Sequence, residues 1–201
     1  MRIAGIINSM KLFLTSSGLS DTNTKDFLNL LGKDPHGLKV AFIPTAMNPE
    51  SEETKEKYIP QDVADLENLG MIVVSIDLES LTEDTIIEAF QSFDIVYVYG
   101  GNTFYLMNEV NRSGFKTHIQ EIIKDKVYVG VSAGSIIAGP DISIAGWPEG
   151  DCNDIGLKDM TGLSLVSYVI QPHWHGQISL ETESCPFEVK SLKDGEAIIE
   201  V

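Results

Sequence analysis

One pentapeptide, Gly130-Val131-Ser132-Ala133-Gly134, has the residue types expected around a nucleophilic serine. The β-branched run Val127 to Val131 is typical of a strand buried on both faces, and the small or apolar residues Ala133 to Ala138 suit a buried helix. Ser132 would then lie in a strained turn between strand and helix, where flanking glycines leave room for close packing. Such a turn exposes the serine Oγ and directs the Ala133 N–H toward a developing oxyanion. Because glycine and serine are common residues, a catalytic serine still requires a base and a second oxyanion donor.

The expected base is His173, in the segment Pro172-His173-Trp174-His175 that follows an apolar run from Leu165 to Gln171. A histidine at the end of a late strand is where the general base of a serine hydrolase could reach Ser132. His173 and His175 would share one face of an extended segment, which also suits a metal pair. No third ligand stands nearby, so we expect neither a metal nor another cofactor.

A second glycine-rich turn, Gly100-Gly101-Asn102, follows the predicted strand Asp94 to Tyr99. Paired glycines let a backbone N–H approach a substrate closely, which makes the Gly101 N–H the candidate for the second oxyanion donor and places Asn102 beside the substrate. The same residues also fit a purely structural role, with a tight turn followed by Asn102 as a helix cap. The sequence leaves both interpretations open.

These turns belong to an alternation of apolar strands and amphipathic helices, which predicts an α/β fold with a mainly parallel sheet covered on both faces. In such sheets the site lies at the carboxyl ends of the strands. We expect one domain over residues 1–201. Residues 1–9 are either an extension ahead of the first strand or the result of a wrongly assigned start codon. The other predicted strands are Lys11 to Thr15, Lys39 to Pro44, Met71 to Ile76 and Glu196 to Val201.

The segment from Ile142 to Leu163 is predicted to be a long loop, because it is rich in glycine and polar residues. More than about 15 residues without regular structure is unusual inside a compact domain and favours a functional loop. Residues Gly146 to Gly156 are the part that could act as a lid.

The composition restricts the partners of the chain. The sequence has 30 acidic and 14 basic residues, a net charge of −16, which would repel nucleic acid and anionic lipid. No apolar run is long enough to cross a membrane, and the amino terminus lacks the pattern of a secretion signal. We therefore expect a cytoplasmic protein, with Cys152 and Cys185 as free thiols.

Taken together, the motifs resemble those of the S51 peptidases, a family of serine peptidases that includes aspartyl dipeptidases and cyanophycinases. The resemblance rests on Tyr99 to Leu106, Gly130 to Ser135 and Pro172-His173, which occur in the same order over nearly the whole chain. It implies a three-layer α/β sandwich similar to the class I glutamine amidotransferases, with serine as the nucleophile. By position, Ser132 matches the nucleophile, His173 the base, and Gly101 with Ala133 the oxyanion donors.

The resemblance leaves the third catalytic residue open. Asp194 falls where related peptidases carry a glutamate that orients the histidine, whereas Asp151 and Asp154 fall near an alternative acidic position; we favour Asp194. The chain also lacks the arginine thought to bind the substrate's aspartyl carboxylate, since none follows Arg112, and Lys190 or Lys193 would be a weaker substitute.

The expected function is therefore a serine-type peptidase that hydrolyses short peptides, without a secure preference for aspartyl residues. The alternatives are an esterase or amidase, and a non-catalytic binding or regulatory protein on the same scaffold. The resemblance also suggests a homodimer.

Overall fold

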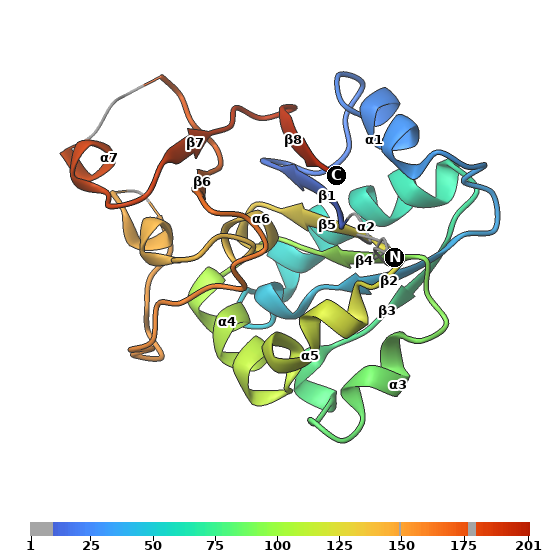
Figure 1. Cartoon of the computed structure of the whole chain (residues 1–201), viewed down its shortest axis with the longest axis horizontal. Coiled ribbons are helices and arrows are strands. Elements are labelled where there is room, and N and C mark those ends of the chain that lie inside the picture. Colours follow the sequence, from blue (N-terminus) through green and yellow to red (C-terminus); the bar gives the residue numbers. More distant parts are fainter. Residues whose placement is uncertain (1–9, 149, 177–179) are drawn as a thin grey trace, which may run out of the picture.

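The structure of the chain, a computed structural model, describes residues 10–148, 150–176 and 180–201. The expected extension over residues 1–9 lies outside the described residues. A six-stranded sheet crosses the molecule, with helices on both of its faces (Figure 1). This arrangement confirms the predicted α/β sandwich with a mainly parallel central sheet.

The sheet has the strand order β3-β2-β4-β5-β1-β8. Its five parallel strands are β1 (Lys11–Thr15), β2 (Lys39–Ile43), β3 (Ile72–Ser75), β4 (Ile95–Val98) and β5 (Val127–Val131). The last strand, β8 (Ala197–Glu200), pairs antiparallel with β1, so its amino end lies at the edge where the parallel strands end. Residues that follow β1, β4 and β5, and residues that precede β8, therefore meet at one edge of the sheet.

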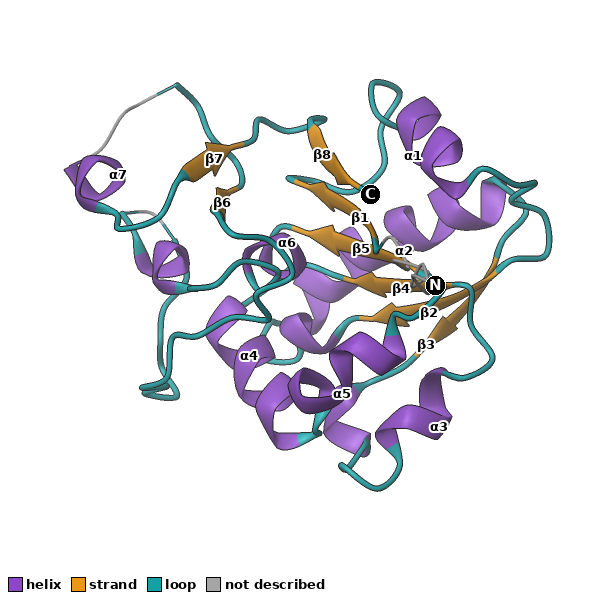
Figure 2. Ribbon diagram, in the orientation of Figure 1, coloured by secondary structure: helices purple, strands orange, loops and turns teal. Residues whose placement is uncertain are grey.

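Side chains alternate between two cores along these strands, as period-two patterning requires. Leu12 and Leu14 of β1 face one core, whereas Phe13 faces the other. Figure 2 shows α1 and α2 on one side of the sheet and α3, α4 and α5 on the other. The helices are α1 (Thr24–Leu31), α2 (Glu52–Asn68), α3 (Ile86–Phe90), α4 (Thr103–Arg112), α5 (Phe115–Ile122), α6 (Ala133–Ile136) and α7 (Leu180–Ser184). Of the helices in the described ranges, none combines the length and apolar character needed to span a bilayer.

The apolar run from Leu165 to Gln171, which we expected to be a strand, is a strand only over its last three residues. Only β6 (Val169–Gln171) is a strand, and it pairs in parallel with β7 (Val189–Ser191) as a separate two-stranded sheet. The N–H of Leu165 donates instead to the carbonyl of Ala138, just past the end of α6. The helix α6 ends at Ile136, two residues before Ala138, the last residue of the predicted helix.

The long segment between Ile142 and Leu163 is irregular over most of its length, as predicted. Its described residues include the short 3₁₀ helix η3 (Ser143–Gly146), and an isolated bridge joins Asp141 to Thr161 at its base. The closing strand is confirmed to within one residue at each end.

Candidate active site

Ser132 lies in the turn between β5 and α6 with φ 48° and ψ −108°, a conformation that L-residues rarely adopt. Strain of this kind costs about 1–3 kcal/mol and persists where the surrounding structure enforces it. The two flanking glycines allow the close packing around this turn. A Cβ on Gly130 would lie 2.6 Å from the carbonyl oxygen of Gly134, and a Cβ on Gly134 would collide with the carbonyl oxygen of Val98. The glycine spacing thus lets α6 lie directly against β5 and β4.

His173 lies two residues beyond the end of β6 and faces Ser132. Its Nε2 is 3.1 Å from Ser132 Oγ, although 41 residues separate the two in sequence. His173 also has a positive φ, 55°, and its backbone N–H donates to Ser16 Oγ at 2.8 Å. The strained backbone and this hydrogen bond together fix the direction of the imidazole.

Asp194 is the carboxylate that meets His173. Its Oδ1 is 2.7 Å from His173 Nδ1 and also accepts a hydrogen bond from Ser16 Oγ at 2.8 Å. Partial burial by itself would raise the pKa of Asp194, but the hydrogen bonds from Ser16 and His173, with the charges of His173 and His175, lower it below its ordinary value. An ionised carboxylate only accepts hydrogen bonds, so Nδ1 carries the imidazole proton and Nε2 is left to accept the hydroxyl proton of Ser132.

The other two acidic candidates are placed differently. Asp151 uses Oδ2 to accept a hydrogen bond from the Thr103 N–H, 2.8 Å away at the start of α4. Asp154 is exposed on the long loop. Among the described residues, Asp194 is therefore the carboxylate that hydrogen-bonds His173.

Ser16, which the sequence analysis did not single out, completes this hydrogen-bond arrangement. It is fully buried and follows β1 directly, at the same edge of the sheet as Ser132. Its hydroxyl donates to the Asp194 carboxylate while accepting from the backbone of His173. A signal was present in the sequence, because Ser16 is a hydroxyl residue immediately after a buried strand whose end lies at the predicted site.

Gly101 and Ala133, the expected oxyanion donors, lie next to Ser132. Their N–H groups have no acceptor within the described part of the chain. Gly101 has φ 127°, and a Cβ there would collide with the carbonyl oxygen of Ala46, so only glycine fits the position. A Cβ on Gly100 would lie 3.2 Å from the Cβ of Ser132, which shows how closely this turn approaches the serine.

Asn102 makes the helix-cap hydrogen bond expected of it and a second contact to the long loop. Its Oδ1 accepts a hydrogen bond from the Tyr105 N–H, and its Nδ2 donates to the carbonyl of Cys152 in the long loop. Its backbone N–H donates to Ala46 at 2.8 Å. The side chain of Asn102 therefore holds the Gly101 turn and the long loop together.

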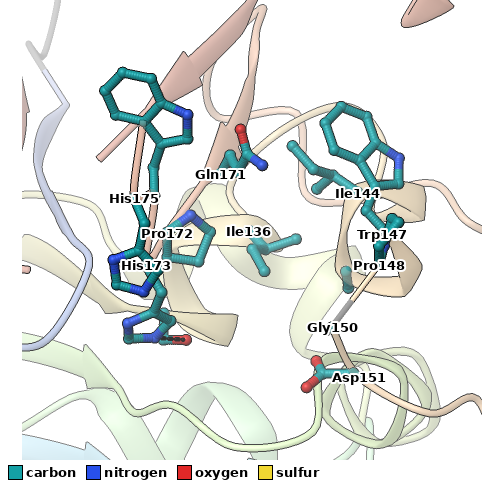
Figure 3. Close-up of a pocket in the computed structure, with 13 residues that line it drawn as sticks. Ile136, Ile144, Trp147, Pro148, Gly150, Asp151, Gln171, Pro172, His173 and His175 are labelled. Carbon is teal, nitrogen blue, oxygen red and sulfur yellow. Dashed lines mark hydrogen bonds between the residues drawn. The ribbon is translucent and has the colours of Figure 1, made fainter. Parts of the chain in front are cut away.

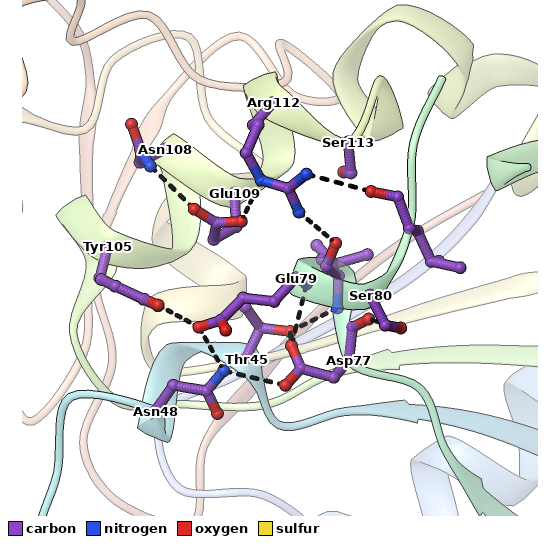
Figure 4. Close-up of polar contacts among 12 residues, drawn as sticks. Thr45, Asn48, Asp77, Glu79, Ser80, Tyr105, Asn108, Glu109, Arg112 and Ser113 are labelled. Carbon is purple, nitrogen blue, oxygen red and sulfur yellow. Dashed lines mark hydrogen bonds and ion pairs between the residues drawn. The ribbon is translucent and has the colours of Figure 1, made fainter. Parts of the chain in front are cut away.

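A polar network supports this turn from the ends of β2 and β3 (Figure 4). Thr45 Oγ1 donates to Asp77, and the Asn48 side chain donates to Asp77 and Glu79. Glu79 in turn accepts a hydrogen bond from the Tyr105 hydroxyl. Partial burial, with the hydrogen bond and charge of Glu79, raises the pKa of Tyr105 to about 12. The network fixes the 3₁₀ helix η1 (Thr45–Met47), whose Ala46 carbonyl contacts the Gly101 turn.

Ser132 and His173 open into a cavity of about 530 Å³ between α6, β6 and the long loop (Figure 3). Much of its wall is apolar, including Ile136, Ile144 and Trp147. The long loop contributes Trp147, Pro148, Gly150 and Asp151 to this wall. The long loop therefore forms part of the cavity wall beside Ser132 and His173.

This chain is similar to known proteins in both sequence and fold. The model of a family described as peptidase family S51 matches residues 12–198. An uncharacterized peptidase of Listeria monocytogenes is 34% identical over 167 residues, which span 82% of this chain and 78% of that protein. Peptidase E of Haemophilus influenzae is 29% identical over 175 residues, 81% of this chain and 72% of that protein. The crystal structure of a candidate peptidase E from Listeria monocytogenes matches with a TM-score of 0.78 and 28% identity, covering 95% of this chain and 94% of that one.

Proposed function

Because the chain belongs to peptidase family S51, we propose that it hydrolyses short peptides with Ser132 as nucleophile, His173 as general base and Asp194 as the residue that orients the imidazole. One observation carries this proposal. Two consecutive hydrogen bonds, of 2.7 Å and 3.1 Å, run from Asp194 through His173 to a serine with a strained backbone at the end of a central strand.

In the proposed first half of the reaction, Ser132 Oγ attacks the carbonyl carbon of the scissile bond while its proton passes to His173 Nε2. The imidazolium that forms is stabilised by the ionised Asp194. The N–H groups of Gly101 and Ala133 donate to the oxyanion of the tetrahedral intermediate, and neither has to give up another acceptor first. His173 then gives the proton to the departing amine, and the acyl group stays on Ser132.

The second half repeats these steps with water as the nucleophile. His173 takes a proton from the water as it attacks the acyl carbon, and returns it to Ser132 Oγ when the ester breaks. Every proton is passed through the same imidazole, so the mechanism assigns each step to residues of this chain. Water can reach His173 because about half of its side-chain surface is exposed.

The cavity supports a short peptide as the substrate. A volume of about 530 Å³ lies within the range of about 300–1,000 Å³ that is typical of sites for small molecules. Neither lysine nor arginine occurs among the described residues that line it. Arg112 does not line the cavity, and its guanidinium binds Glu109 and the carbonyls of Leu78 and Leu81. Within the described ranges, the cavity therefore offers no arginine to an aspartyl side chain.

A panel of dipeptides with acidic, apolar and basic first residues, together with simple esters, tests the proposal. The wild-type protein is expected to release amino acids from at least one dipeptide, and Ser132→Ala to lose nearly all turnover. Ser143→Ala is the matched control, because it removes an exposed hydroxyl from the long loop. Equal turnover by Ser132→Ala and the wild type would contradict the assignment of the nucleophile. The homodimer, the cytoplasmic location and the lack of a nucleic-acid partner remain predictions from the sequence.

A further inference from the structure

The wall of the cavity facing His173 carries one carboxylate, that of Asp151, among the described lining residues. Figure 3 shows Asp151 across the cavity from His173. Its Oδ2 accepts the hydrogen bond from the Thr103 N–H, whereas Oδ1 has no hydrogen-bond partner within the described ranges. The positive end of α4 offsets about half a charge at most, so Asp151 still presents negative charge to the cavity.

Asp151 is also close to the position expected for the scissile carbonyl. Its partner, the Thr103 N–H, is only two residues from the Gly101 N–H that we assign to the oxyanion, and two residues span at most about 7 Å. In a peptide the nitrogen of the first residue is two bonds from the carbonyl carbon of that residue. A substrate whose first residue is attacked by Ser132 would thus bring its amino group to the same side of the cavity as Asp151.

The rest of the wall favours an apolar side chain over an acidic one. Ile144 and Trp147 lie on the same stretch of loop as Asp151 and face the cavity. Lys193 Nζ lies 5.6 Å from the ring centroid of Trp174, which lines the cavity, but Lys193 itself is not part of the wall. An acidic substrate side chain would add a second negative charge near Asp151, with no lysine or arginine among the described lining residues to bind it.

From this arrangement, and resting on the proposed function, we propose that Asp151 binds the free α-ammonium group of a peptide substrate whose apolar or aromatic first side chain packs against Ile144 and Trp147. The site then acts on the first residue of a peptide. A peptide with a blocked amino group would lose the ion pair, and a longer amino-terminal extension would meet the loop that carries Asp151.

Binding to catalytically inactive protein tests this subsite without any need for turnover. Titration calorimetry on Ser132→Ala is carried out with phenylalanyl-alanine, its N-acetyl form and aspartyl-alanine, and repeated after adding Asp151→Asn. Asparagine keeps an oxygen that can accept the Thr103 N–H but removes the charge. Adding Asp154→Asn instead is the matched control, because it removes one charge from the exposed part of the same loop.

We expect phenylalanyl-alanine to bind the Ser132→Ala protein most tightly, and Asp151→Asn to weaken its binding about tenfold, the usual loss for a hydrogen bond to a charged group. Asp151→Asn should weaken binding of the N-acetyl peptide less than twofold. Asp154→Asn should not change the affinity for either peptide. The subsite proposal is contradicted if Asp151→Asn weakens the binding of both peptides equally or changes the binding of neither. It is also contradicted if the Ser132→Ala protein binds neither peptide. The catalytic proposal is judged separately by the turnover of the wild-type protein, so the two can fail independently.

Discussion

Asp194 meets His173 because the two short strands that precede them, β6 and β7, run parallel and end together. Gln171 of β6 and Ser191 of β7 are partners in the register, and His173 and Asp194 follow them by two and three residues. Beyond this pair the chains remain joined, since the Leu192 N–H donates to Gln171 and the Trp174 N–H donates to Leu192. The two-stranded sheet thus sets the 2.7 Å contact between imidazole and carboxylate.

Asp194→Asn should lower kcat by about 100-fold or more while changing KM little. An asparagine amide can donate to His173 Nδ1, which favours the tautomer with its proton on Nε2 and leaves no acceptor for the Ser132 hydroxyl. Steady-state kinetics on the best dipeptide of the panel measures the effect. Asp154→Asn should keep wild-type kcat, and the assignment of Asp194 would be wrong if the two variants behaved alike.

Ser16→Ala should lower kcat about tenfold and raise the pKa of Asp194. The variant removes the hydroxyl that donates to Asp194 and accepts from the His173 backbone, and a hydrogen bond to a charged group contributes about 1.5–3 kcal/mol. The pKa rises because one of the hydrogen bonds that stabilise the ionised carboxylate is lost. Carboxyl-carbon NMR of wild type and variant measures this pKa directly. A lower kcat with an unchanged pKa would mean that Ser16 only stabilises the fold.

Asp62 on α2 should make the protein less stable as the pH rises from about 4. Its pKa is raised, mainly by burial and also by the charge of Asp65, although hydrogen bonds from Tyr99 and Tyr97 act in the opposite direction. The folded state therefore holds the proton more tightly than the unfolded state, so the contribution of Asp62 is complete below its unfolded pKa and is lost as pH rises through the folded pKa.

Urea unfolding between pH 4 and pH 8 tests whether the contribution of Asp62 to stability falls as the pH rises. The free energy of unfolding of wild type minus that of Asp62→Asn should fall across the window. The corresponding difference for Glu53→Gln, an exposed carboxylate on the same helix, should stay nearly flat. A difference for Asp62→Asn that rises with pH would show that the tyrosine hydrogen bonds outweigh burial.

The central strands were predictable from the sequence because burial on both faces requires a continuous run of apolar residues. The runs Lys11–Thr15 and Val127–Val131 are uninterrupted, and the structure gives both strands with the predicted bounds. The pairing of β6 with β7 was not predictable, since each has three residues and its partner lies about 20 residues away. Strands this short depend on tertiary contacts more than on local sequence preference.

The residues of the candidate site were likewise predictable only where a local sequence pattern marks them. Ser132 and the Gly101 turn could be located because each follows a buried strand, and parallel strands end at one edge. The choice among Asp151, Asp154 and Asp194 depended on the path of the chain after His173, which no local pattern records. Ser16 was missed although it also follows a strand, because its role rests on contacts with residues more than 150 positions away.

The most direct test of the account is the mass of the intact protein after exposure to a fluorophosphonate probe. An activated Ser132 attacks the phosphorus, fluoride leaves, and the serine proton passes to His173. The account predicts one added probe group on the wild-type protein, located on Ser132 by peptide mapping, and none on Ser132→Ala or His173→Ala. No adduct on the folded wild-type protein, or equal labelling of Ser132→Ala, would contradict the claim that Ser132, His173 and Asp194 form a working catalytic unit.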